Sequence, residues 1–172
     1  MGGAISAAVL AAALAAGCGY RVAGRTNAVP PSVHTIAVPA FENRTTRYRI
    51  EQRLTEATVR EFLVRTAYRI VPDAAGADAV VHGKVVRLET TPLLFDTATG
   101  RATTMLVTVH CEVSFEQTGS GQVLYRNANF LFRNEYEIST DVKSFFEEQD
   151  PALERMSRDF AARLVAAVTE GF

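Results

Sequence analysis

The segment 104–116 carries the most restrictive pattern in this sequence, because apolar and polar residues alternate along nearly all of it. Such alternation is typical of a β-strand with one dry face and one hydrated face. A strand of this kind belongs to a sheet that is packed on one side only, which is usual for antiparallel sheets. The residues expected to point inward are Met105, Val107, Val109, Cys111, Val113 and Phe115.

Four further segments have the composition and boundaries of strands. A β-bulge near Gly83 is needed to reconcile Val81 and Val85 with Val86 and Leu88 on one face. The turn at 118–121, Thr-Gly-Ser-Gly, predicts a hairpin. In the returning strand, one face is expected to hold Leu124, Ala128, Phe130 and Phe132. The predicted strands are 33–39, 68–71, 79–89 and 123–136, with 41–45 as a loop.

Two segments have the apolar period of amphipathic helices. The first is predicted over 46–65, with a stripe made of Ile50, Leu54, Ala57 and Val64. The second is predicted to begin at Asp150 and Pro151, since an N-cap aspartate followed by proline is a common helix start. Its stripe consists of Leu153, Met156, Phe160, Leu164, Ala167 and Val168.

The order of these elements predicts an α+β fold. Both helices have one apolar face, and the sheet has one apolar face. We therefore expect two amphipathic helices packed on one face of a four- to five-stranded, mostly antiparallel sheet.

The N-terminus reads as a lipoprotein signal. Residues 4–16 are apolar but too few to span a bilayer, and the run Leu-Ala-Ala-Gly-Cys at 14–18 resembles a lipobox. The sequence therefore predicts a signal peptide at 1–17, lipidation of Cys18, a linker at 18–32 and a single α+β domain at 33–172. An ordinary cleaved signal, with Cys18 incidental, is the alternative. Gly19 stands where inner-membrane lipoproteins typically have Asp, which favours the outer membrane.

No catalytic motif or cofactor site is recognisable, and we expect neither an enzyme nor a bound cofactor. The formal net charge of −1 gives no footprint for nucleic acid. Cys111 is expected to be a buried thiol rather than a nucleophile. A hairpin folded near Asp96 would set His82 opposite His110, and Glu112 would complete a metal site or an enzyme's active site; we expect no metal there.

The segment 91–101 is the strongest candidate for a contact surface. Leu93, Leu94 and Phe95 fall near the end of the predicted hairpin, and Arg101 follows. Exposed apolar groups beside a cation suit insertion into a lipid or another protein. The alternative is that they fold back onto the sheet edge.

The chain resembles the LptE-type family of lipopolysaccharide-assembly lipoproteins. The resemblance rests on the combination of five segments in order, none of which is specific alone. They are Cys-Gly-Tyr-Arg at 18–21 with Gly24, Thr-Ile-Ala-Val-Pro-Ala-Phe-Glu-Asn at 35–43, Thr-Gly-Arg-Ala at 99–102, Gly-Gln-Val-Leu-Tyr at 121–125, and Pro-Ala-Leu-Glu-Arg at 151–155.

This resemblance implies a two-helix, four-stranded fold and a non-enzymatic role. Family members plug the lipopolysaccharide translocon barrel of the outer membrane, help it fold and bind lipopolysaccharide. The resemblance implies ligand contacts at Arg101 and, more weakly, Lys143, because lipid A is phosphorylated and acylated. It places the chain at the periplasmic face of the outer membrane. A second hypothesis is another envelope lipoprotein, serving as an interaction module for cell-wall or secretion machinery.

Overall fold

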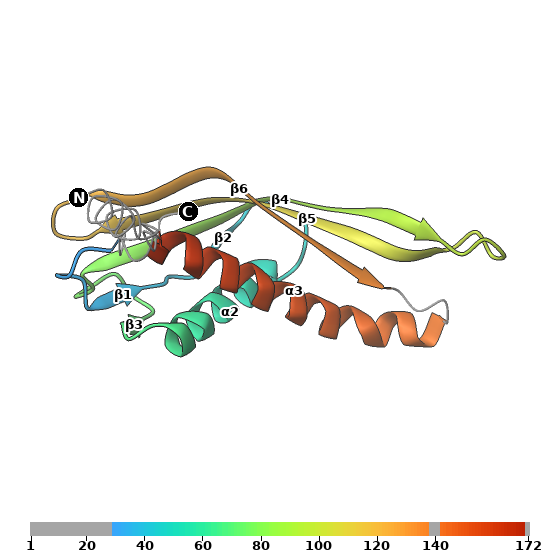
Figure 1. The fold of residues 1–172 in the computed structure, drawn as a ribbon, viewed down its shortest axis with the longest axis horizontal. Helices are drawn as coiled ribbons and strands as arrows, with labels where there is room; N and C mark the ends of the chain where they lie inside the picture. Colours follow the sequence, from blue (N-terminus) through green and yellow to red (C-terminus); the bar gives the residue numbers. More distant parts are fainter. Residues whose placement is uncertain (1–28, 138–141, 171–172) are drawn as a thin grey trace, which may run out of the picture.

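The computed structural model describes residues 29–137 and 142–170, with only the backbone described for 142–150. Figure 1 shows a sheet with two helices side by side on one of its faces. In chain order the elements are β1 (Thr35–Ala37), β2 (Glu42–Asn43), α2 (Ile50–Arg65), β3 (Arg69–Val71), β4 (Ala79–Phe95), β5 (Ala102–Gln117), β6 (Val123–Glu137) and α3 (Val142–Glu170).

The sheet is mixed, with the order β3-β1-β4-β5-β6 and β2 beside β4. The three short strands run parallel to their neighbours. For β1 and β3 this follows because α2 carries the chain back from β1 to the start of β3. The three long strands form antiparallel hairpins. The predicted fold class is therefore confirmed, with one additional two-residue strand, β2, in a segment predicted to be a loop.

The core lies between the helices and one face of the sheet. Along β5 the predicted alternation is confirmed, since Val107, Val109, Val113 and Phe115 are at most 4% exposed. Phe160 of α3 is fully buried, and its ring meets the rings of two β6 phenylalanines edge-on, at centroid distances of 5.6 and 5.8 Å.

The buried face of α2 includes Ile50, Leu54 and Ala57 of the predicted stripe but not Val64. Val64 is 81% exposed, whereas Phe62, which the stripe left out, is fully buried. The buried residues Ile50, Leu54, Thr58 and Phe62 follow one row at intervals of four. Such a row drifts around the helix by about 40° per step, and helices commonly pack along it. The predicted stripe runs parallel to the helix axis and therefore excludes Phe62, which lies along this drift.

Helix α3 begins at Val142, not at Asp150 as predicted, and Pro151 lies inside it. Proline removes one backbone hydrogen bond from a helix, but its fixed φ is compatible with helical backbone. An Asp-Pro pair can thus lie within a helix as well as start one. The predicted apolar stripe is confirmed, because Met156, Phe160, Leu164, Ala167 and Val168 are buried and Leu153 packs against them.

Bulges decide which side chains of the long strands face the core. In β4 the register shifts between Val85 and Arg87, so the extra residue is Val86, which is 40% exposed, and not Gly83 as predicted. In β6 a shift opposite Cys111 and Val113 leaves Ala128 exposed, contrary to its expected place beside Phe130. A bulge inserts one residue and therefore reverses the inward and outward positions beyond it.

Gly83 has a packing role. A Cβ at this position would lie 2.7 Å from the ring of Phe41, which is 4% exposed and belongs to the core. We predict that Gly83→Val displaces this ring and lowers the free energy of unfolding by about 1–3 kcal/mol. Chemical denaturation measures the change. Gly119→Val is the control, because no atom lies within 4 Å of the added Cβ; equal effects of both substitutions would contradict the packing role.

Candidate functional site

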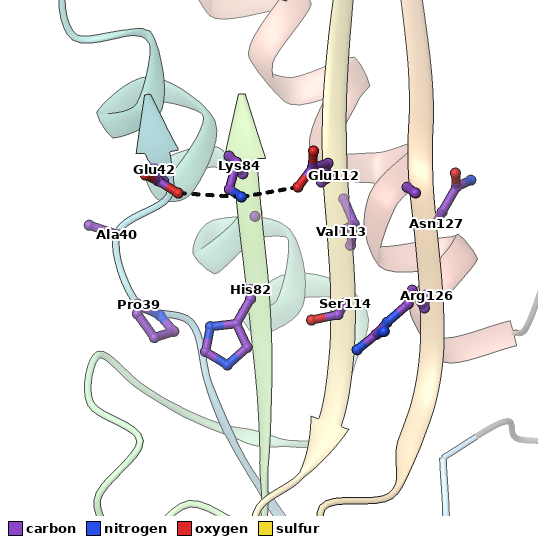
Figure 2. Close-up of a pocket in the computed structure, with 12 residues that line it drawn as sticks. Pro39, Ala40, Glu42, His82, Lys84, Glu112, Val113, Ser114, Arg126 and Asn127 are labelled. Atoms are coloured by element: carbon purple, nitrogen blue, oxygen red, sulfur yellow. Dashed lines mark hydrogen bonds and ion pairs between the residues drawn. The ribbon is translucent and has the colours of Figure 1, made fainter. Parts of the chain in front are cut away.

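The open face of the sheet, away from the helices, has a hollow of about 440 Å3 over β4, β5 and β6 (Figure 2). Lys84 lies between two carboxylates there, with its Nζ 3.7 Å from Glu42 and 3.1 Å from Glu112. These three side chains are partly exposed, so their ion pairs add little stability.

A second charged pair flanks the same hollow. Arg126 lies 3.1 Å from the carboxylate of Glu116. Hydrogen bonds from Ser114 and from Arg126 lower the pKa of the Glu116 carboxyl. The two cations of the hollow, Lys84 and Arg126, are thus each neutralised by acids of the same sheet. This face is a hydrated surface that balances its own charge.

The arrangement in which a hairpin folded near Asp96 sets His82 opposite His110, considered above as a possible metal site, does not occur. The register pairs His82 with Ser114 and His110 with Arg87, so four positions along β5, about 13 Å, separate the two histidines. His110 Nε2 instead lies 3.5 Å from the carboxylate of Glu89. Across the part of the chain that the structure describes, no three His, Cys, Asp or Glu side chains are grouped as metal ligands would be.

Cys111 is a core residue, as predicted. It is 1% exposed, and burial raises its pKa to about 12. The thiol is therefore neutral at physiological pH and out of reach of a substrate, so it lacks both requirements of a nucleophile.

The far end of the β4–β5 hairpin carries three exposed apolar side chains. Leu93, Leu94 and Phe95 are 41%, 61% and 57% exposed. They lie on β4 itself, which extends to Phe95 instead of ending at 89. Their exposure excludes the alternative in which they fold back onto the sheet edge, and it leaves an apolar patch on a hairpin that projects past α2 (Figure 1).

The turn that closes this hairpin is held by Asp96. Its carboxylate accepts hydrogen bonds from the backbone N–H groups of Ala98 and Thr99, at 3.0 and 2.6 Å, and from the Thr99 hydroxyl at 2.8 Å. The Thr99 contacts are the main cause of the lowered pKa of Asp96. Gly100 has a φ of 67°, which favours glycine. Arg101, which is exposed, thereby follows an ordered turn and precedes β5.

The other two predicted site residues are not placed in detail. Cys18 lies outside the described residues. Lys143 falls in the first turn of α3, where only the backbone is described.

One cavity of the structure has no counterpart among the features predicted from the sequence. A slot of about 370 Å3 lies between α3 and the apolar face of β4, β5 and β6. Two arginines, Arg47 and Arg155, line it together with apolar side chains. In the sequence, those apolar residues are indistinguishable from ordinary core residues. No local pattern indicates that α3 and the sheet separate here. They are Leu88, Met105, Val107, Tyr136, Leu153 and Met156.

Residues 33–168 match the family model described as LptE: Lipopolysaccharide-assembly. The chain belongs to the LptE family. The family consists of non-enzymatic lipoproteins, in agreement with the expectation that the chain catalyses no reaction. Within the described part of this LptE-family chain, neither helix is long and apolar enough to span a bilayer. No match was found among curated proteins.

Solved structures with TM-scores above 0.5 share the fold of this LptE-family chain at low sequence identity. Lipoprotein B from Nitrosomonas europaea is 12% identical with a TM-score of 0.52, over 89% of this chain and 92% of that one. The hypothetical protein CT253 from Chlamydia trachomatis is 10% identical with a TM-score of 0.52, over 80% and 98%. Rare lipoprotein B from Shewanella oneidensis is 16% identical with a TM-score of 0.47, over 77% and 92%.

Proposed function

We propose that this protein is a lipid-anchored lipoprotein of the outer membrane, facing the periplasm. It assists assembly of the lipopolysaccharide translocon barrel and the transport and insertion of lipopolysaccharide at the cell surface. The observation that carries the proposal is the LptE family match over 33–168. The elongated two-layer fold (Figure 1) supports it, because a narrow module with a projecting hairpin can enter a pore.

Depletion and co-purification test this proposal together. The lipoprotein, extracted from the envelope in mild detergent, should carry a large outer-membrane barrel with it, and its depletion should reduce lipopolysaccharide at the cell surface. Unchanged surface lipopolysaccharide after depletion would reject the role. Recovery of cell-wall or secretion components in place of a barrel would favour the second hypothesis, a general envelope interaction module.

The hairpin end is the proposed contact with the barrel. Leu93, Leu94 and Phe95 expose apolar area that a partner or its surrounding lipid would cover. A photo-crosslinking residue at position 95 should capture the barrel in the native envelope. A crosslinker at Val123, which is 44% exposed on β6 near the opposite end of the sheet, provides the comparison. Equal capture from both positions would count against a specific contact at the hairpin end.

Arg101 and, more weakly, Lys143 are the proposed contacts for lipid A phosphates. We predict that Arg101→Glu weakens lipopolysaccharide binding by at least about tenfold, since charge-assisted hydrogen bonds contribute roughly 1.5–3 kcal/mol. A lipid-displacement assay measures the effect, and an unchanged melting midpoint verifies folding. Arg133→Glu, at an exposed position on β6, is the matched charge reversal. Binding that survives Arg101→Glu intact would remove Arg101 from the contact.

A further inference from the structure

The slot between α3 and the sheet is open although core-type side chains line it. From the sheet side, Leu88, Met105 and Tyr136 face it, and from α3, Leu153 and Met156 do. In Figure 1, α3 continues past the N-terminal end of α2, so this part of α3 has no second helix beside it. At about 370 Å3 the slot lies within the range of sites for small ligands, roughly 300–1,000 Å3.

Two arginine side chains lie beside the apolar side chains of the slot. Arg47, from the loop before α2, and Arg155, from α3, both line the slot, and neither guanidinium pairs with an acid among the described side chains. Glu135 and Asp159 also line it. The side-chain amide of Asn134 donates a hydrogen bond to Oδ2 of Asp159 at 2.9 Å. An apolar slot bordered by two guanidiniums that form no ion pair with a described acid suits a ligand that has an aliphatic chain and an anionic end.

The slot itself is lined by two arginines and two acids, and an excess of arginines over acids begins on the neighbouring surface. Arg155 and Arg158 are i, i+3 neighbours on α3, which places them side by side. Arg158 lines a second depression, between α2 and α3, together with three other arginines and only two acids. One of those acids, Glu154, lies 3.9 Å from Arg60. A ligand with more than one phosphate would therefore meet guanidinium groups beyond the slot as well as at it.

We propose that this slot binds one fatty acyl chain of lipid A, with a phosphate of the same molecule against Arg47 and Arg155. This inference rests on the proposed role in lipopolysaccharide transport, and it adds a second contact, separate from Arg101 at the hairpin end. Burial of the acyl chain supplies the hydrophobic term. Guanidinium–phosphate hydrogen bonds supply the orientation. Lipid A is favoured over a phospholipid with one phosphate because the cationic surface extends past the slot.

Photo-crosslinking locates the acyl chain on the unaltered protein. Full-length acylated lipoprotein in detergent is mixed with lipid A that carries a diazirine in an acyl chain, irradiated and mapped by mass spectrometry. We expect adducts at Met105, Leu153 and Met156. A matched diazirine phosphatidylglycerol should give at most about one tenth of the yield there. Equal yields from the two lipids would overturn the assignment to lipid A, and absence of adducts in the slot would overturn the site itself.

A substitution that fills the slot provides a second test of the proposal. Thr90 is exposed and lines the slot, so Thr90→Trp should occupy it and reduce the slot adducts at least about tenfold. The control is Thr91→Trp, on the opposite face of β4, which should leave them unchanged. Arg155→Gln should also reduce the adducts, whereas Arg163→Gln, at another exposed position of α3, should not. Unchanged adducts in Thr90→Trp would overturn the slot proposal.

Different results would reject the acyl-chain slot and the role in lipopolysaccharide transport. Adducts confined to the hairpin end, with binding that still depends on Arg101, would reject the slot and leave the transport role intact. Unchanged surface lipopolysaccharide after depletion would reject the transport role, on which the slot's assignment to lipid A depends.

Discussion

Replacing Phe160 by alanine should lower the free energy of unfolding by about 3–5 kcal/mol. Phe160 is fully buried at the centre of α3, and its ring meets those of Phe130 and Phe132 edge-on. The substitution removes the transfer free energy of a benzyl group and leaves a cavity between the helix layer and β6. Since a domain of this size is stable by only about 5–15 kcal/mol, the loss is a large share of the total.

Thermal and denaturant unfolding measure this effect. For a chain of this length, a loss of 3–5 kcal/mol lowers the melting midpoint by roughly 6–20 °C. Val64→Ala is the control on α2, because Val64 is 81% exposed and surface substitutions usually stay within about 0.5 kcal/mol. A melting midpoint unshifted by Phe160→Ala would remove this ring from the core.

Replacing Cys18 by serine should release the protein from the outer membrane. If Cys18 is lipidated as proposed, its acyl chains hold the protein in place, each buried methylene contributing about 0.8 kcal/mol. Without them, we expect the variant to be missing from the outer-membrane fraction. The natural protein should incorporate labelled palmitate, and the variant should not. Fractionation and labelling together measure the result.

The second cysteine supplies the matched control. Cys111→Ala should leave palmitate incorporation unchanged, since the Cys111 thiol is 1% exposed and its pKa is raised to about 12. Retention of palmitate by Cys18→Ser, or recovery of the natural protein from the cytosol, would reject the lipid anchor and with it the proposed location.

Periodic features of the sequence predicted the fold well. The alternation in β5 and the stripe in α3 each identified the buried face, because most residues on those faces meet the same dry layer. The four- to five-stranded, mostly antiparallel sheet was predicted from these patterns, and the observed sheet adds only β2. Two residues of strand, Glu42 and Asn43, are too few to give a period.

The errors came from places where the period changes. Val86 and the bulge opposite Cys111 and Val113 shift the strands by one residue, and a bulge can be placed at several neighbouring positions with similar apolar patterns. The supposed pairing of His82 with His110 failed for a related reason: a pairing register depends on where the turn closes and on each bulge along the way. Phe62 was missed because the contact row on α2 winds around the helix.

Of the two candidate binding regions, the sequence indicated the hairpin end but not the slot. The predicted hairpin singled out Leu93, Leu94 and Phe95, with Arg101 beside them, because large apolar residues at a hairpin end are exposed to water. The structure leaves the three apolar side chains exposed. The slot had no such signal, since Met105, Leu153 and Met156 have the positions and the chemistry of core residues in their own segments.

The sequence by itself determined which elements form and which face of most of them is dry, because local propensity and periodic hydrophobicity act within one segment. Only the tertiary structure decided the strand register, the separation of the histidines, and the place where α3 and the sheet stand apart beside Arg47 and Arg155. These properties depend on the relative length and crossing of elements distant in the chain. α3 extends past the N-terminal end of α2 (Figure 1). No pattern within a single segment predicts how far one helix extends beyond the other.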